Sequence, residues 1–295
     1  MTDYMVRAIA AGEQIRAFAV TGRELVEYAR SAHNTSPIAT AALGRTMCAG
    51  LMMADMLKGK DDVLTIQVNG DGPLQGITVT ADNHGTVKGY VKNPAVILPP
   101  KENGHLNVGG AVGSGTLSVS RDLENGQVYG SSVELHSGEI ADDLTWYFAE
   151  SEQVPSSVGL GVLMNKDNTV REAGGFIIQL MPNTDDAVIS RLEENIGKLP
   201  DVTEMLREGK NPEELLETVL SGFDLTITDR QPVNFSCNCS RDRVSRALKL
   251  LGPEELDSMI NDGEPVTLHC QFCEKQYTFN IEELKGLRAG LPASE

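Results

Sequence analysis

The chain has 295 residues, of which 42 are acidic and 25 basic, so its formal net charge is −17 at pH 7. A charge of this sign repels phosphate groups, which argues against nucleic acid or an anionic membrane as a partner. Charged residues interrupt the N-terminal segment and no run of eighteen apolar residues occurs, so we expect no signal peptide and no membrane-spanning helix. We therefore predict a cytoplasmic protein, in which paired cysteines more often bind metal or do redox chemistry than form permanent disulfides.

Residues 1–182 are predicted to form a mixed α/β core domain with antiparallel sheets, in a protein of the α+β class. Alternating apolar residues predict the strands, and turn signals such as Asn69–Pro73 separate them. The expected strands are Met5–Ala10, Gln14–Thr21, Val63–Val68, Leu74–Thr80, Thr86–Val91, Gly115–Arg121, Gln127–Leu135 and Gly174–Met181. The expected helices are Arg23–His33, Pro37–Leu57 and Glu139–Glu150. The glycine-rich stretch Gly109–Gly115 lacks the lysine of a phosphate-binding loop, so we expect a simple loop before a strand.

Residues 183–235 form an acidic segment in which twelve acidic residues outnumber five basic ones. Capping signals at Asp201 with Glu204, and at Asn211 with Pro212, predict short helices that end at glycines. Helices of this length are marginally stable by themselves. We therefore interpret the segment as a helical linker that is held in place by docking its apolar stripes on another part of the protein.

Four of the five cysteines lie in two close pairs near the C-terminus, Cys237–Cys239 and Cys270–Cys273. Four thiolates match the closed tetrahedral shell that one zinc ion prefers. We predict that residues 236–295 form a small domain of helices and a β-hairpin (Pro265–His269 and Gln276–Phe279), which is too small to be stable without a staple such as zinc. The same sulfurs could instead form two disulfides, and the spacing does not choose among the three possible pairings. A permanently structural zinc ribbon is the simpler alternative.

Several other residues carry weaker signals. Cys48 lies on an apolar helix and is interpreted as a buried structural thiol. His269 adjoins a cysteine, but four thiolates already complete a zinc shell. A basic cluster follows the first cysteine pair and is interpreted as a solvated helix face, as a partner for thiolate charge, or as a nucleic-acid contact. The cluster consists of Arg241, Arg243, Arg246 and Lys249.

The segment Phe235–Arg241, the pair Cys270–Cys273 and the aromatic residues Tyr277 and Phe279 resemble the zinc domain of the bacterial redox-regulated 33 kDa chaperonins. Motifs of the N-terminal part are similar to the core domain of the same family. They are Gly70–Leu74, Tyr147, Ser151–Gln153 and Gly174–Pro182. The resemblance spans nearly the whole chain, and no departure from the pattern removes a zinc ligand.

The resemblance implies an ATP-independent holdase chaperone, not an enzyme, that binds unfolding client proteins and prevents their aggregation under oxidative and heat stress. Its reduced form would be an inactive monomer in which Cys237, Cys239, Cys270 and Cys273 hold one zinc ion. Oxidation would form the disulfides Cys237–Cys239 and Cys270–Cys273, release zinc, unfold the zinc domain, loosen the linker and give an active dimer. The need of the linker helices for docking separately predicts that undocking would expose a client-binding surface that includes Val188, Ile189, Leu192, Leu215, Leu216 and Val219.

Two other classes of function compete with the chaperone hypothesis. A zinc-ribbon protein could bind nucleic acid through the basic cluster, although the net charge of −17 opposes this. A thiol–disulfide oxidoreductase could use Cys270 and Cys273, but the pair lacks the βαβ context of thioredoxin-like enzymes.

Overall fold

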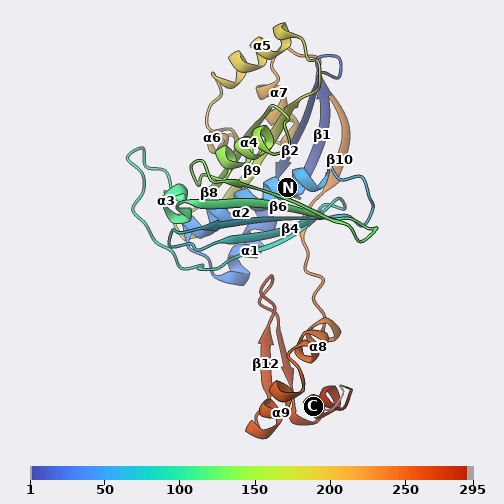
Figure 1. Ribbon diagram of the computed structural model, residues 1–295. Helices are drawn as coiled ribbons and strands as arrows, with labels where there is room; N and C mark the ends of the chain where they lie inside the picture. The colour runs from blue at the N-terminus through green and yellow to red at the C-terminus, as the bar shows by residue number, and fades with distance from the viewer. Residues whose placement is uncertain (1, 291–295) are drawn as a thin grey trace. The chain divides into compact units, whose positions relative to one another are not determined.

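The computed structural model describes residues 2–290 and divides the chain into two compact units, one that ends at Ser236 and one that begins at Cys237 (Figure 1). The first unit contains two larger β-sheets with their helices, and the second contains a hairpin with three helices. The predicted α+β class with antiparallel sheets is confirmed. The division of the first unit at residue 182 stays a prediction.

The first sheet has five antiparallel strands in the order β10-β1-β2-β9-β8. Its members are β1 (Tyr4–Ala10), β2 (Ile15–Thr21), β8 (Ser156–Met164), β9 (Val170–Leu180) and β10 (Thr226–Pro232). The β1–β2 hairpin turns through Ala11, Gly12 and Glu13, all of which have positive φ. The edge strand β10 pairs with β1 across more than 200 residues of sequence, which ties the segment after residue 183 to the start of the chain.

The second sheet has six strands in the order β11-β5-β4-β3-β6-β7. Its members are β3 (Val63–Gly70), β4 (Ile77–Asp82), β5 (Thr86–Val91), β6 (Gly115–Asp122), β7 (Val128–Glu134) and β11 (Asn234–Phe235). All neighbours are antiparallel except β11, which pairs with β5 in the parallel direction.

The long helix α2 (Pro37–Ala54) is the centre of the main core, and nearly all of its residues are buried. Its start combines two strong signals, since Ser36 accepts a hydrogen bond from the backbone N–H of Ala39 and Pro37 occupies the first helical turn. Small residues allow close packing: a side chain at Gly44 would collide with Val26 of α1 (Arg23–His33). This core also contains side chains of α4 (Ala141–Glu150) and of both sheets.

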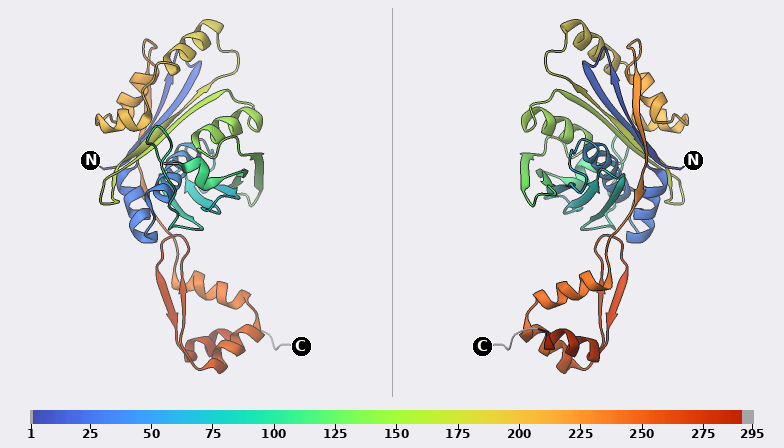
Figure 2. Two further views of the ribbon diagram at one scale, coloured as in Figure 1. Left: turned by 90° about the vertical axis from the view of Figure 1, so that its left-hand side faces the viewer. Right: turned by 90° about the vertical axis from the view of Figure 1, so that its right-hand side faces the viewer.

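The opposite face of the first sheet is covered by three short helices of the acidic segment, as Figure 2 shows. They are α5 (Asp186–Ile196), α6 (Val202–Arg207) and α7 (Pro212–Val219), where the capping signals predicted helices. Their apolar side chains form a second core with Val6, Ala8, Ile15 and Phe176 of the sheet. Because alternate residues of a strand point to opposite faces, the first sheet has apolar side chains on both faces and must be covered twice.

Three parts of the first unit differ from the sequence-based expectation. The strands β8, β10 and β11 were not expected, and the strand expected at Leu74–Thr80 is β4, which begins at Ile77. The glycine-rich stretch is not a plain loop, because its first part forms the short helix α3 (Val108–Val112). The Asn107 side chain caps this helix by accepting a hydrogen bond from the N–H of Gly110, an interaction that glycine content alone does not reveal.

The second unit contains α8 (Arg241–Leu250), α9 (Pro253–Asp262), the hairpin of β12 (Val266–His269) and β13 (Gln276–Phe279), and α10 (Ile281–Ala289). Side-chain caps start two of these helices. Ser240 accepts a hydrogen bond from the N–H of Arg243, and Asn280 forms a reciprocal capping box with Glu283. These local signals start α8 directly after Cys239 and α10 directly after β13.

The buried carboxyl group of Asp3 makes the stability of the first unit depend on pH. Its Oδ2 accepts a hydrogen bond of 2.8 Å from the N–H of Leu25 at the start of α1. Burial raises the pKa of Asp3 from 3.8 to about 6, although backbone hydrogen bonds oppose the rise. The folded state therefore binds the proton more tightly than the unfolded state, so stability should fall as the pH rises from about 4 to about 6 and then level off.

We expect Asp3→Asn to weaken this pH dependence, since an amide does not titrate in that range. Urea unfolding followed by the fluorescence of Trp146, the one tryptophan of the sequence, measures the first unit at each pH. The wild-type midpoint should fall between pH 4 and pH 6 by more than the midpoint of the variant. Equal slopes for the two proteins would show that another group is responsible.

Candidate metal centre

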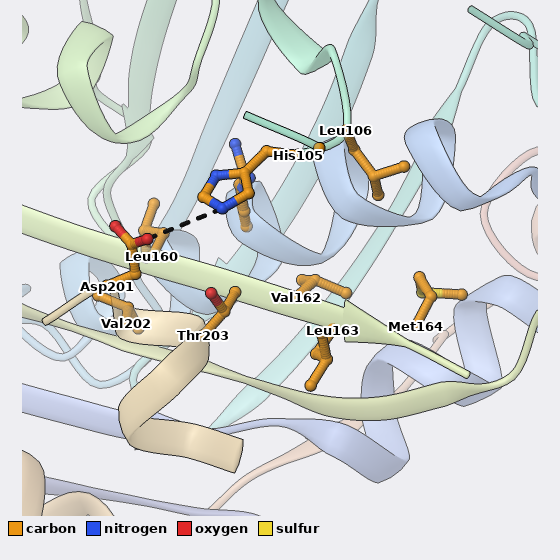
Figure 3. Close-up of a pocket in the computed structure, with 11 residues that line it drawn as sticks. His105, Leu106, Leu160, Val162, Leu163, Met164, Asp201, Val202 and Thr203 are labelled. Carbon is orange, nitrogen blue, oxygen red and sulfur yellow. Dashed lines mark ion pairs between the residues drawn. The ribbon is translucent and has the colours of Figure 1, made fainter. Parts of the chain in front are cut away.

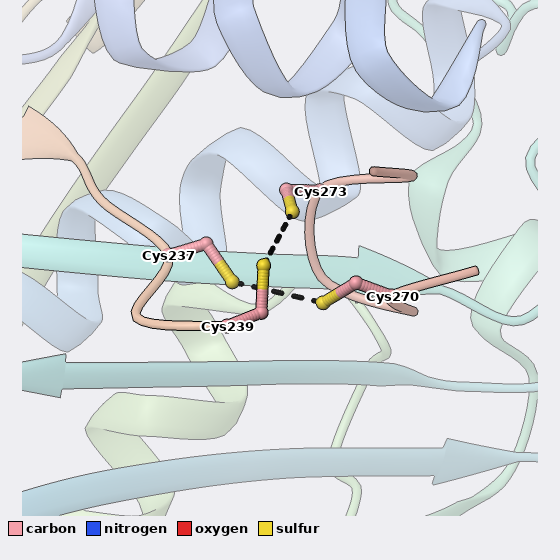
Figure 4. Close-up of side chains that lie close together, drawn as sticks. All are labelled: Cys237, Cys239, Cys270 and Cys273. Carbon is pink, nitrogen blue, oxygen red and sulfur yellow. Dashed lines mark hydrogen bonds between the residues drawn. The ribbon is translucent and has the colours of Figure 1, made fainter. Parts of the chain in front are cut away.

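The four predicted cysteines meet in the second unit, two from an extended segment and two from a hairpin turn (Figure 4). Cys237 and Cys239 lie just before the N-cap of α8. Cys270 follows β12, and the backbone then turns tightly, with the N–H groups of Cys273 and Glu274 both donating to the carbonyl of Cys270. A positive φ at Glu274 completes the turn and leads into β13. The hairpin thus presents both of its sulfurs on one side.

The sulfur positions match a tetrahedral metal site. All four Sγ atoms lie within 4.8 Å of one another. Two of these separations are 3.7 Å, between Cys237 and Cys270, and 3.5 Å, between Cys239 and Cys273. Four sulfurs at about 2.3 Å from a zinc ion would be about 3.8 Å apart, whereas a disulfide bond is about 2.0 Å long. The thiols are free, and their arrangement fits a metal ion with four sulfur ligands.

The hydroxyl group of Tyr277 acts directly on one thiol, since it donates a hydrogen bond of 3.1 Å to Cys239 Sγ. Burial raises the pKa of Cys239, but this hydrogen bond and those from the neighbouring thiols outweigh it and hold the pKa at about 7. Burial raises the pKa values of Cys237 and Cys273. The cluster therefore offers one thiolate close to neutral pH, and a thiolate is the form that binds metal or reacts with an oxidant.

The apolar core beneath this site is small. Within the described part of the second unit, the buried apolar side chains form one cluster of Leu248, Leu256, Tyr277, Phe279 and Leu284. Tyr277 and Phe279 are the two aromatic residues on which the family resemblance rests. Both lie on the strand β13, which follows the cysteine turn. A core of this size supports only a few kcal/mol of stability, roughly 3–5 kcal/mol. The unit therefore needs the additional cross-link that the thiol cluster can supply by binding a metal.

The basic cluster divides into a structural residue and a solvated face. The Arg241 guanidinium donates to the carbonyl of Thr278, forms an ion pair of 2.7 Å with Glu283 and lies over the ring of Phe279. Arg241 thus joins the start of α8 to β13 and α10. Arg243 and Arg246 are exposed on α8, as the interpretation of a solvated helix face expects.

Two other candidate residues lie away from the metal cluster. His269 faces Glu274, with 3.6 Å between Nδ1 and Oε2, and the four clustered ligand atoms are all sulfurs. Cys48 is fully buried in α2, where burial raises the pKa of its thiol well above the ordinary value. The prediction of a structural thiol at Cys48 is therefore confirmed.

The residues proposed as a client-binding surface are largely covered in this structure. Leu192, Leu215, Leu216 and Val219 are buried in the second core of the first unit, and Val188 packs against it. Ile189 is half-buried. Docking of the acidic segment is therefore observed, whereas binding of clients by these residues is not tested by the structure.

One side of the docked segment is incompletely packed, as Figure 3 shows. A pocket of about 310 Å³ is lined by residues at the start of α6, in β8 and in the loop before α3. Val202 and Thr203 line it opposite Leu160 and Val162, and Asp201 lies 3.8 Å from the ring nitrogen Nε2 of His105 across it. Beyond this pocket α6 is docked as firmly as α7, because Met205 and Leu206 are buried in the same core as Leu215, Leu216 and Val219.

Comparison with known proteins identifies the family. The family model described as "Hsp33 protein" matches residues 3–280. The "33 kDa chaperonin" of Agathobacter rectalis is 53% identical over 288 residues, covering 98% of this chain and 100% of the relative. The protein of the same name from Lachnoclostridium phytofermentans is 52% identical and covers 97% of this chain and 98% of its own length.

A solved structure agrees with these relatives. The crystal structure of the 33 kDa chaperonin of Thermotoga maritima, a heat shock protein 33 homolog, matches with a TM-score of 0.92 at 34% identity and covers 98% of each chain. The fold and the four-cysteine cluster define a protein with a large α+β unit and a small unit whose four thiols could hold a metal ion. The chain belongs to the Hsp33 family, and this membership supports a role as a chaperone for unfolded proteins. Among the described residues, no helix is long and apolar enough to cross a membrane.

Proposed function

We propose that this chain is a redox-regulated, ATP-independent holdase that acts in the cytoplasm and has no catalytic activity. One observation carries the proposal: four thiols converge to within 4.8 Å in a unit whose buried core is a single small cluster. Because the thiols both hold the unit together and can be oxidised, their chemistry would decide whether that unit is folded. The family membership supports the chaperone part of the proposal.

The metal that best fits the site is one zinc ion bound by Cys237, Cys239, Cys270 and Cys273. Four thiolates in a closed tetrahedral shell are a common structural site for zinc. A structural zinc contributes an apparent free energy of about 10–16 kcal/mol to a small domain. Since whole domains are stable by only about 5–15 kcal/mol, the second unit would unfold when its thiolates no longer hold the ion.

Oxidation would remove the ligands in pairs. An oxidant such as hydrogen peroxide or hypochlorite accepts two electrons for each disulfide, so four thiolates give two disulfides and release four electrons. We propose the pairing Cys237–Cys239 and Cys270–Cys273, for which the family resemblance is the support. These bridges close loops of three or four residues and stabilise by only about 2 kcal/mol or less in the chain-entropy model. They would not replace the zinc, because neither joins the two halves of the unit.

The docked acidic segment would then become the second part of the switch. Residues 183–235 carry a net charge of −7 from twelve acidic and five basic residues, which opposes compaction. Their short helices are stable only while Leu215, Leu216 and Val219 are buried on the first sheet. Loss of the folded second unit would loosen this segment and expose those side chains to clients. We further propose that the reduced form is a monomer and the oxidised form a dimer.

The proposal is tested by adding peroxide or hypochlorite to the reduced, zinc-loaded protein at elevated temperature, without ATP. Zinc release, followed with a colorimetric chelator, should rise together with suppression of the aggregation of a heat-unfolded client. Dithiothreitol with added zinc should reverse the change in the free chaperone and serves as the control. Zinc release with no gain in suppression would favour a permanently structural zinc domain.

A further inference from the structure

A second cavity lies in the first unit, away from the acidic segment. It has a volume of about 160 Å³ and is enclosed by the end of α2, both sheets and α4. One wall is apolar and includes Met53, Met56, Phe148 and Val154. The lining also includes the polar side chains of Arg16, Arg121, Glu152 and Gln179. The cavity therefore offers both apolar and charged side chains to a ligand.

The charged groups around this cavity are paired except for Arg16. Glu152 accepts hydrogen bonds from Arg121, at 2.7 Å, and from the hydroxyl group of Tyr147, at 2.6 Å. Asp55 attracts Arg16 electrostatically, but its side chain forms an ion pair of 2.6 Å with Arg7. These pairs neutralise one another and leave one positive charge, that of Arg16, at the cavity.

The guanidinium of Arg16 has too few partners for its position. It donates one hydrogen bond of 2.6 Å, from Nη2 to Oε1 of Gln179. Its Nε is buried and has no hydrogen-bond partner among the described residues. No acidic side chain among the described residues forms an ion pair with Arg16. A half-buried charge without a counter-ion is unfavourable, and it is unusual in a chain with a net charge of −17. The other described partner of the guanidinium is the ring of Phe18, whose centroid lies 5.7 Å from Cζ of Arg16, and neither this ring nor the Gln179 side chain carries a negative charge.

We propose that this cavity binds a short-chain monocarboxylate, with its carboxylate on Arg16 and its carbon chain against the apolar wall. A planar guanidinium pairs well with a carboxylate, because two parallel N–H groups can meet its two oxygens. The cavity has room for about five water molecules at about 30 Å³ each, which corresponds to a chain of about four to six carbons. The paired Arg121 and Glu152 close the polar side without adding net charge.

The test uses hexanoate and the reduced, zinc-loaded full-length protein, with 1-hexanol and inorganic phosphate as comparison probes. Hexanoate should bind saturably and shift the NMR signals of the Arg16 guanidinium group. Hexanol has the same chain without the charge, and phosphate has charge without a chain, so each should bind at least about tenfold more weakly, given the strength of charge-assisted hydrogen bonds. Equal binding of either probe would overturn the proposal, and this comparison needs no variant.

Substitutions test the role of the single residue. Arg16→Gln should weaken hexanoate binding at least about tenfold, whereas Arg16→Lys should lose less because it keeps the charge. Arg171→Gln is the matched control, since it removes the same charge from an exposed position. Arg171 lies at the start of β9, whereas Gln179, the partner of Arg16, lies near its end. Undiminished binding by Arg16→Gln would overturn the assignment. The measurement involves neither oxidant nor client, so its outcome is independent of the proposed chaperone switch.

Discussion

Replacing Cys239 by serine is expected to unfold residues 237–290 while the first unit remains folded. The substitution removes the thiol whose pKa is held at about 7 and breaks the four-sulfur shell. With three thiolates, most of the apparent 10–16 kcal/mol that a structural zinc contributes would be lost, and this exceeds what the small core supplies, roughly 3–5 kcal/mol. Hydrogen–deuterium exchange resolved by peptide should show rapid exchange in the second unit, and the bound zinc should fall well below one per chain.

Cys48→Ala is the control for removing a thiol, because Cys48 is buried in the main core and lies in the other unit. This variant should keep one zinc per chain and a protected second unit. Protection of the second unit in Cys239→Ser at the wild-type level would contradict the prediction. It would mean that the apolar cluster of Leu248, Leu256, Tyr277, Phe279 and Leu284 suffices to hold the unit together.

Replacing Leu216 by alanine is expected to undock the acidic segment without any oxidant. Leu216 is fully buried between α7 and the first sheet, and truncating a buried leucine typically costs about 2–5 kcal/mol. That cost is large for a segment of short helices that depends on docking for its stability. Limited proteolysis of the reduced protein should cleave residues 183–220 faster than in the wild type. Under the proposed function, the same variant should suppress client aggregation partly before oxidation.

Glu217→Ala is the matched control on the same helix, because Glu217 is exposed beside Leu216 and the substitution leaves the buried stripe intact. Its proteolysis pattern should equal that of the wild type. The two readouts of Leu216→Ala separate the claims. Unchanged proteolysis would contradict the importance of docking, whereas faster proteolysis with no gain in suppression would place the client-binding surface elsewhere.

Local chemistry determined much of the second unit from the sequence alone. Ser240, and Asn280 with Glu283, start helices by capping, and the tight turn at Cys270–Cys273 presents two thiols. Such features depend on residues a few positions apart, so their outcome is encoded in short windows of sequence. Each close cysteine pair is also a short-range feature, and the two pairs together predicted a shared metal site. Only the folded structure shows that all four sulfurs meet.

The strands that sequence patterns missed depend on distant partners. Within β8, Gly159 and Gly161 weaken the strand signal, but side chains at these positions would collide with Phe176 and crowd Val202 and Thr203 of α6. The edge strand β10 is polar and becomes a strand because β1 offers it backbone hydrogen bonds. Neither partner is visible in the local sequence.

The sequence by itself determined the ligand set of the candidate metal site, the positions of most helices and the acidic character of the segment before it. Only the tertiary structure decided which apolar stripes are covered, that Tyr277 donates to Cys239, and that Arg16 lacks a counter-ion. The physical reason is distance along the chain. Capping and turn formation act between near neighbours, whereas burial, charge pairing and strand pairing join residues that only the fold brings together.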